Sequence, residues 1–189
     1  IYKAKYDFTL ANMREEYFNV RGKLMIDTIT AKVLAIYFNI VTEDKKQELV
    51  LELVNEIKRR KYHITTGFIG TPYILFVLAD NGYFDVAGKM IMNHEFPGWL
   101  YEVDMGATTT WERWSSLMPD GKPDSKGMNS YNHYAYGAMK EFIYEKVLGI
   151  ESIGVGFKKV NIAPHVIEGV DKMWGEYNSV SGLIKSSYE

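Results

Sequence analysis

The sequence predicts a mainly α-helical protein that ends in a short β-stranded segment. Through the first 150 residues, stretches with apolar residues at helical spacing alternate with short loops. Beyond about residue 150 the pattern changes to short, alternating stretches typical of strands. We therefore expect paired helices over 1–150 and the opening strands of a β domain over 151–189, which is incomplete because two or three strands cannot close a sheet.

Three helices are expected in the first part of the chain. The first covers 3–16 and is followed by a turn near Asn19 and Gly22, and the second covers 28–40. The third begins after Thr42, a residue type that caps helix N-termini. Its apolar residues are spaced for one buried face: Leu49, Val50, Leu53, Val54 and Ile57.

More helices are expected further along the chain. One has Pro72 in its first turn, where proline costs nothing, and ends near Asn81; another covers 85–93. The stretch "GATTTWERW" (106–114) is expected on a short helix, and a long helix is expected over 131–148.

The C-terminal strands are expected in two places. Residues 157–164 alternate between apolar and polar, and 173–189 has the pattern of a hairpin with its turn near Ser181 and Gly182.

Composition narrows the classes of partner and cofactor. A net charge of −2 gives no reason to expect nucleic acid or an anionic membrane surface as a partner. Cysteine is absent, which excludes disulfides and thiolate metal sites, and the four histidines are not at metal-ligand spacing. We expect neither metal nor cofactor. The longest apolar run, 73–79, is far shorter than the ~20 residues that span a bilayer.

The N-terminus "IYKAKYDF" has neither an initiator methionine nor a signal-peptide pattern. We therefore expect an internal piece of a longer protein. Its compartment stays open between the cytoplasm and the periplasm or exterior of a bacterium.

Three stretches contain glycine and aromatic residues, with threonine in the first two and asparagine in the third: "HITTGFIGTP" (63–72), "GATTTWERW" (106–114) and "MNSYNHYAYG" (128–137). Each is expected in a loop or at the start of a helix. Such helix ends can converge at the mouth of a helical barrel. A cleft there would combine a carboxylate, an imidazole, hydroxyls and flat apolar rings, a mixture that suits a polyhydroxylated ligand.

Structural explanations for the same residues stay open at this point. Glu112 can be a surface or salt-bridged glutamate, and Trp111 and Trp114 can pack in the core. His133 can be a hydrogen-bonded core histidine.

The order and spacing of these motifs carry a family resemblance. "HITTGFIGTPYIL", "GATTTWERW", "MNSYNHYAYGA" and the closing "GFKKVNIAP" together resemble the bacterial α-L-rhamnosidases of glycoside hydrolase family 78. The match runs from about residue 28 to the end of the chain. The resemblance implies the second half of an (α/α)6 barrel of paired helices, followed by the first strands of a C-terminal β-sandwich. The chain departs from the family pattern at Ile29 and Gly98.

The resemblance also implies an activity and site residues. The family removes terminal α-L-rhamnosyl groups with inversion, which requires one carboxyl group as acid and another as base. Glu112 matches the general base, and His133 matches a histidine that contacts the bound sugar. The general acid would lie in the missing N-terminal half of the barrel, the implied partner of this chain beside its carbohydrate substrate. We therefore expect the isolated chain to be inactive.

Two alternatives remain at the level of sequence. One is a non-catalytic relative that binds rhamnose without cleaving it. The other is a related helical-barrel glycosidase or lyase that acts on another sugar, since residues from both barrel halves set specificity.

Overall fold

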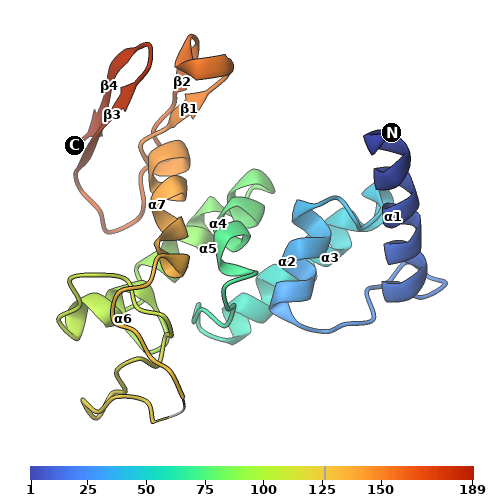
Figure 1. The fold of residues 1–189 in the computed structure, drawn as a ribbon, viewed down its shortest axis with the longest axis horizontal. Coiled ribbons are helices and arrows are strands. Elements are labelled where there is room, and N and C mark those ends of the chain that lie inside the picture. Colours follow the sequence, from blue (N-terminus) through green and yellow to red (C-terminus); the bar gives the residue numbers. More distant parts are fainter. Residues whose placement is uncertain (126) are drawn as a thin grey trace. The chain divides into compact units, whose positions relative to one another are not determined.

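A computed structural model of the chain describes residues 1–125 and 127–189, and it consists of two compact units (Figure 1). The first unit is Ile1–Val86 and the second is Ala87–Glu189. The division falls inside helix α5 (Phe84–Ile91), which matches the helix expected over 85–93.

The first unit is helical, as expected. Its helices are α1 (Tyr2–Tyr17), α2 (Ile29–Tyr37), α3 (Glu43–Arg59) and α4 (Thr71–Asp80). Helix α2 packs against both α3 and α4, and the five apolar residues expected on the inner face of α3 are all buried. The buried face of α3 is therefore the one that the sequence pattern predicted.

Capping in this unit differs from expectation at one position. Thr42 occupies the N-cap position of α3, but its side chain makes no capping hydrogen bond. The side-chain cap is instead at α2, where the Ala31 N–H donates to Thr28 Oγ1 at 3.1 Å. Acidic Glu43 and Asp44 in the first turn of α3 still favour its start through the helix dipole.

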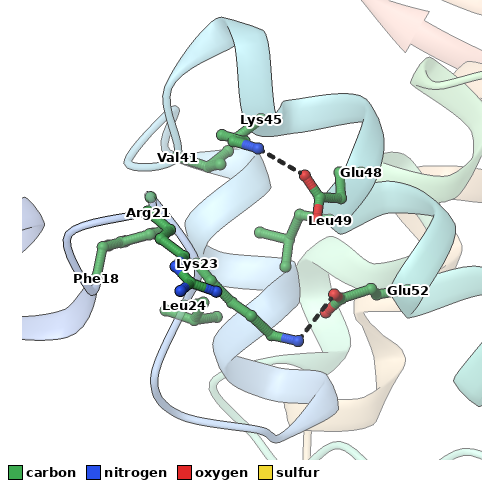
Figure 2. Close-up of a pocket in the computed structure, with 10 residues that line it drawn as sticks. Phe18, Arg21, Lys23, Leu24, Val41, Lys45, Glu48, Leu49 and Glu52 are labelled. Atoms are coloured by element: carbon green, nitrogen blue, oxygen red, sulfur yellow. Dashed lines mark hydrogen bonds and ion pairs between the residues drawn. The ribbon is translucent and has the colours of Figure 1, made fainter.

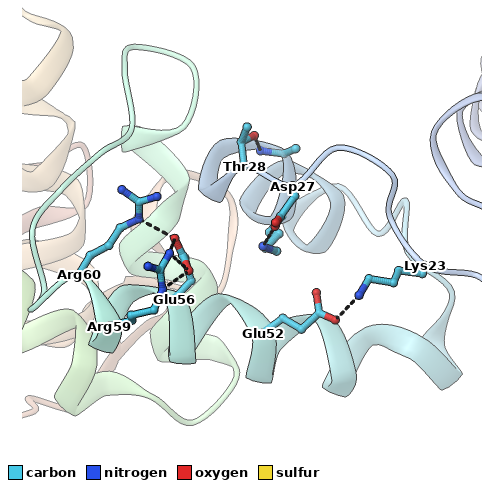
Figure 3. A network of polar contacts seen from close by, with 9 residues as sticks. Lys23, Asp27, Thr28, Glu52, Glu56, Arg59 and Arg60 are labelled. Carbon is cyan, nitrogen blue, oxygen red and sulfur yellow. Dashed lines mark hydrogen bonds and ion pairs between the residues drawn. The ribbon is translucent and has the colours of Figure 1, made fainter.

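Charged side chains connect the loop before α2 to the surface of α3 (Figure 3). Lys23 forms an ion pair with Glu52 at 3.4 Å. Near the end of α3, Glu56 pairs with Arg59 at 2.7 Å and Arg60 at 2.6 Å, and these hydrogen bonds lower the pKa of Glu56. The two arginines at the end of α3 are therefore solvent-exposed and paired with the same glutamate.

A small pocket lies between the loop after α1 and helix α3 (Figure 2). Phe18, Leu24 and Leu49 supply apolar walls, and the Lys45–Glu48 ion pair (3.0 Å) lies at its edge. Its cavity volume of about 20 Å³ holds about one water molecule. It is therefore too small to hold a sugar.

The second unit combines short helices with two hairpins. After α6 (Trp99–Asp104), a helical run comprises the 3-10 helix η1 (Ala135–Ala138), α7 (Met139–Phe142) and the π-helix η2 (Ile143–Val147). Strand β1 (Ile150–Ser152) pairs antiparallel with β2 (Val160–Ile162) around the 3-10 turn η3 (Val155–Phe157), and β3 (Met173–Ser179) pairs antiparallel with β4 (Gly182–Tyr188). The expected hairpin over 173–189 is confirmed, with its turn at 180–181.

Two helix expectations in this unit are wrong. The helix expected over 131–148 begins only at Ala135, and the stretch 106–114 is an irregular loop rather than a short helix. Both differences have one cause. The backbone groups of the two stretches form hydrogen bonds with each other instead of within a helix.

No helix among residues 1–125 and 127–189 is long and apolar enough to cross a membrane. Within the same described residues, no cluster of three or more His, Asp or Glu side chains could hold a metal ion.

Gly149 joins the helical run to β1 under tight constraint. It has φ +67°, and an added Cβ would lie 2.1 Å from the Ala163 carbonyl carbon and 2.5 Å from Pro164 N. The position therefore requires glycine for both its backbone conformation and its space.

We expect Gly149→Ala to lower the free energy of unfolding by about 2–5 kcal/mol, from left-handed strain and overpacking together. The matched control is Gly169→Ala, which has φ +87° but open space around its Cβ. It should cost only about 1–2 kcal/mol. Urea unfolding of both variants measures the difference, and equal losses would show that the close approach is unimportant.

Candidate active site

The second and third candidate stretches lie side by side in the second unit. The Glu112 N–H donates to the Ser130 carbonyl at 2.9 Å, and the His133 N–H donates to the Thr110 carbonyl at 2.8 Å. The Thr110 hydroxyl returns a hydrogen bond to the His133 carbonyl at 2.6 Å, and the Thr109 hydroxyl donates to the carbonyl of Tyr131. The two predicted site residues, Glu112 and His133, therefore stand on adjoining backbone segments.

The threonine run explains the irregular conformation locally. Threonine is β-branched, which lowers its helix propensity and favours extended backbone. The hydroxyls of Thr109 and Thr110 both bond across to the other segment. The Thr109 hydroxyl therefore helps to hold the two segments together.

The tryptophans of the motif pack as structural side chains, although not on a helix. Trp114 stacks on Tyr136 with ring centroids 3.9 Å apart, and Trp99 meets Trp114 edge-on at 5.4 Å. Trp111 is 4% exposed and contacts Tyr131 edge-on at 5.7 Å. The aromatic rings therefore join α6, the Glu112 loop and the start of the last helical run.

Glu112 is half-buried at this junction. Its backbone is fixed by Ser130, but its carboxylate has no hydrogen bond or ion pair within the part of the chain that the structure describes. Among the described residues, Glu112 is therefore not a salt-bridged glutamate, which was one of the structural explanations left open by the sequence. A carboxylate held by its backbone on a rigid loop can accept a proton from a water or hydroxyl placed against it.

His133 is also half-buried, and its backbone is held on both sides by Thr110. Its Nδ1 accepts the Ala135 N–H at 3.2 Å, and its ring stacks on exposed Tyr134 at 5.1 Å. Because Nδ1 is the acceptor, the neutral ring carries its proton on Nε2. Nε2–H is the kind of donor that binds a sugar hydroxyl.

The first candidate stretch, 63–72, lies in the other compact unit. Its buried threonines have a structural role there, since the hydroxyls of Thr66 and Thr71 are 2.8 Å apart at the start of α4. Gly70 is close-packed, because an added Cβ would lie 3.0 Å or less from side-chain atoms of Thr66 and Thr30.

A buried carboxyl group that the sequence did not predict lies behind the Glu112 loop. Glu102 on α6 is 3% exposed, and its Oε2 accepts the Trp111 N–H at 3.4 Å. Its Oε1 has no partner among the described residues. The spacing of Trp99 and Glu102, three apart on one helix face, was the available signal.

Burial raises the pKa of Glu102 from 4.5 to about 7, although the Trp111 N–H acts in the opposite direction. Burial, together with the charge of Glu102, also raises the pKa of the Tyr136 hydroxyl. Glu102 is therefore a buried carboxyl group whose pKa reaches neutrality.

The raised pKa predicts a pH dependence of stability. Between about pH 4.5 and 7 the folded state keeps the Glu102 proton that the unfolded chain releases. This stabilisation is complete below about pH 4.5 and is lost as the pH rises through about 7. It amounts to about 3 kcal/mol. Urea unfolding of wild type and Glu102→Gln across this range should show the wild type losing stability relative to the variant. Parallel curves would contradict the prediction.

Comparison with known proteins identifies the family. The bacterial alpha-L-rhamnosidase six-hairpin glycosidase domain matches residues 1–147. An alpha-L-rhamnosidase of Streptomyces avermitilis is 38% identical over 168 residues, which are 89% of this chain and 16% of the relative. One of Formosa agariphila is 35% identical over 190 residues, 100% of this chain and 20% of the relative.

The solved structures that resemble this chain are also alpha-L-rhamnosidases. The Streptomyces avermitilis alpha-L-rhamnosidase complexed with L-rhamnose superposes with a TM-score of 0.93 at 35% identity, covering 97% of this chain and 18% of that chain. Native alpha-L-rhamnosidase of Aspergillus terreus gives a TM-score of 0.94 at 28% identity, covering 98% of this chain and 22% of that chain. The chain thus spans less than a quarter of the length of these relatives.

These likenesses confirm the fold predicted from the motifs, a mainly helical domain of paired helices with C-terminal strands. By sequence and by structure, the chain belongs to the family of bacterial alpha-L-rhamnosidase six-hairpin glycosidase domains.

Proposed function

We propose that this chain is part of an inverting α-L-rhamnosidase in which Glu112 is the general base. The observation that carries the proposal is the pairing of the Glu112 and His133 loops, which holds both residues on adjoining segments. A relative with 35% identity and the same fold has been solved with L-rhamnose. The substrate class follows from that likeness, and the role of each residue follows from its chemistry.

Inverting hydrolysis needs a water molecule between the base and the anomeric carbon. The two carboxyl groups of such enzymes stand about 6.5–9.5 Å apart to admit that water. Glu112 takes a proton from the water as its oxygen bonds to the anomeric carbon, while a second carboxyl group protonates the departing glycosidic oxygen. The available carboxylate of Glu112 suits this role.

His133 is proposed to bind the sugar rather than to transfer a proton in the reaction. With Nδ1 accepting the Ala135 N–H, the ring is fixed and Nε2–H can donate to a sugar hydroxyl. The exposed ring of Tyr134, stacked on the imidazole, supplies an adjacent flat apolar surface.

The general acid is proposed to lie in the part of the barrel that this chain lacks. The relatives are about five to six times longer than the matched segment. In this proposal residues 1–150 belong to the catalytic barrel and 151–189 open the C-terminal β domain. The chain alone supplies the base and not the acid, so we expect it to be inactive by itself.

The first test replaces the proposed base in the full-length protein. Glu112→Gln should lower kcat on an aryl α-L-rhamnoside by ~10²–10⁴-fold, because an amide cannot accept the proton. NMR should show the β-anomer released first by the wild type. The control is Glu168→Gln, a glutamate of the same unit with its side chain 87% exposed.

An unimpaired Glu112→Gln variant would make Glu112 structural. Rhamnose binding without turnover in the wild type would favour a non-catalytic binding relative. Faster turnover of a different glycoside would favour a related glycosidase acting on another sugar.

The second test concerns His133. His133→Ala should raise KM about tenfold through the lost hydrogen bond to the sugar. His94→Ala is the matched control, because His94 is exposed and pairs with Asp104 at 2.6 Å. An unchanged KM would mean that His133 fixes the loop without touching substrate.

A further inference from the structure

We infer that Glu102 is a positioning residue for the proposed general base. Its buried carboxyl group holds the backbone of Trp111 and so fixes the loop that presents Glu112. The inference rests on the proposed function, and it assigns a role to a side chain that never touches the substrate.

Helix α6 lies against both loops of the site through three buried side chains. The Trp99 indole donates to the Tyr136 carbonyl at 2.9 Å, and the Tyr101 hydroxyl donates to the Leu117 carbonyl at 2.7 Å. Glu102 accepts from the Trp111 N–H. One short helix thus bonds the backbone on both sides of Glu112, and also just beyond His133.

The two amides next to the base are held by different elements. The Trp111 N–H bonds to Glu102 on α6, whereas the Glu112 N–H bonds to Ser130 in the neighbouring loop. A backbone fixed at two successive residues by two separate elements has little freedom to rotate. The direction in which the Glu112 side chain leaves the loop is therefore set from both sides.

Glutamate at this position is not explained by packing alone. The site is buried, and a carboxyl group with its Oε1 unpartnered is costly there, whereas a leucine of similar size would not be. The gain is the acceptor for the Trp111 N–H, which would otherwise be a buried donor without a partner. This requirement predicts which substitutions are tolerated.

The test uses the full-length protein with Glu102→Gln, Glu102→Leu and a control, Asp104→Asn. Glutamine keeps an oxygen acceptor, whereas leucine fills the space without one. Asp104 is on the same helix, and its half-exposed carboxylate pairs with His94. Each variant is measured for kcat and KM on an aryl α-L-rhamnoside, and for amide hydrogen exchange in the segment 107–115.

We expect Glu102→Leu to lose exchange protection in 107–115 alone and to lower kcat by ~10–100-fold, with KM within about threefold, since small displacements of a catalytic group are this costly. Glu102→Gln should keep the protection and stay within about threefold of the wild-type kcat. Asp104→Asn should match the wild type in both measurements.

Three outcomes would overturn the inference. One is wild-type exchange and kcat in Glu102→Leu, and another is an equal loss in the Gln and Leu variants. The third is faster exchange along the whole chain, which would indicate a general loss of stability. If the wild type itself hydrolyses no rhamnoside, the proposed function fails, and the exchange data alone decide whether Glu102 holds the loop.

Discussion

The pairing of the 109–112 and 130–133 segments is the constraint on which the rest of the site depends. Thr110 exchanges hydrogen bonds with both backbone groups of His133, and the Glu112 N–H adds a third bond to Ser130. Backbone polar groups taken out of water need partners, and the two irregular loops supply several of these partners to each other. Neither Glu112 nor His133 would have a fixed place without this pairing.

The paired loops are supported from behind by aromatic side chains. Trp114 is between Trp99 of α6 and Tyr136 of the last helical run, one contact edge-on and the other stacked. Large buried rings contribute much of the packing energy available to such a small unit. The loops that carry the chemistry therefore stand on a rigid base, as is usual where binding residues lie outside regular elements.

The helices of the first unit were predictable because the residues that they bury follow a local pattern in the sequence. The stripe on α3 repeats at helical spacing, and every member of it is buried. The hairpin of β3 and β4 was predictable for a similar reason, since alternation and turn residues mark it. Capping at Thr42 was a weaker signal, because the residue type permits a cap without requiring one.

The sequence by itself determined the helical class, the strands at the end and, through its motifs, the family with Glu112 and His133 as its site candidates. Tertiary structure alone decided that 106–114 is a loop, that the last helical run begins at Ala135, and that Glu102 is buried behind the proposed base. The physical reason is the separation along the chain of the residues that interact. Periodicity records which side of an element is buried, whereas hydrogen bonds between segments distant in the chain leave no periodic trace.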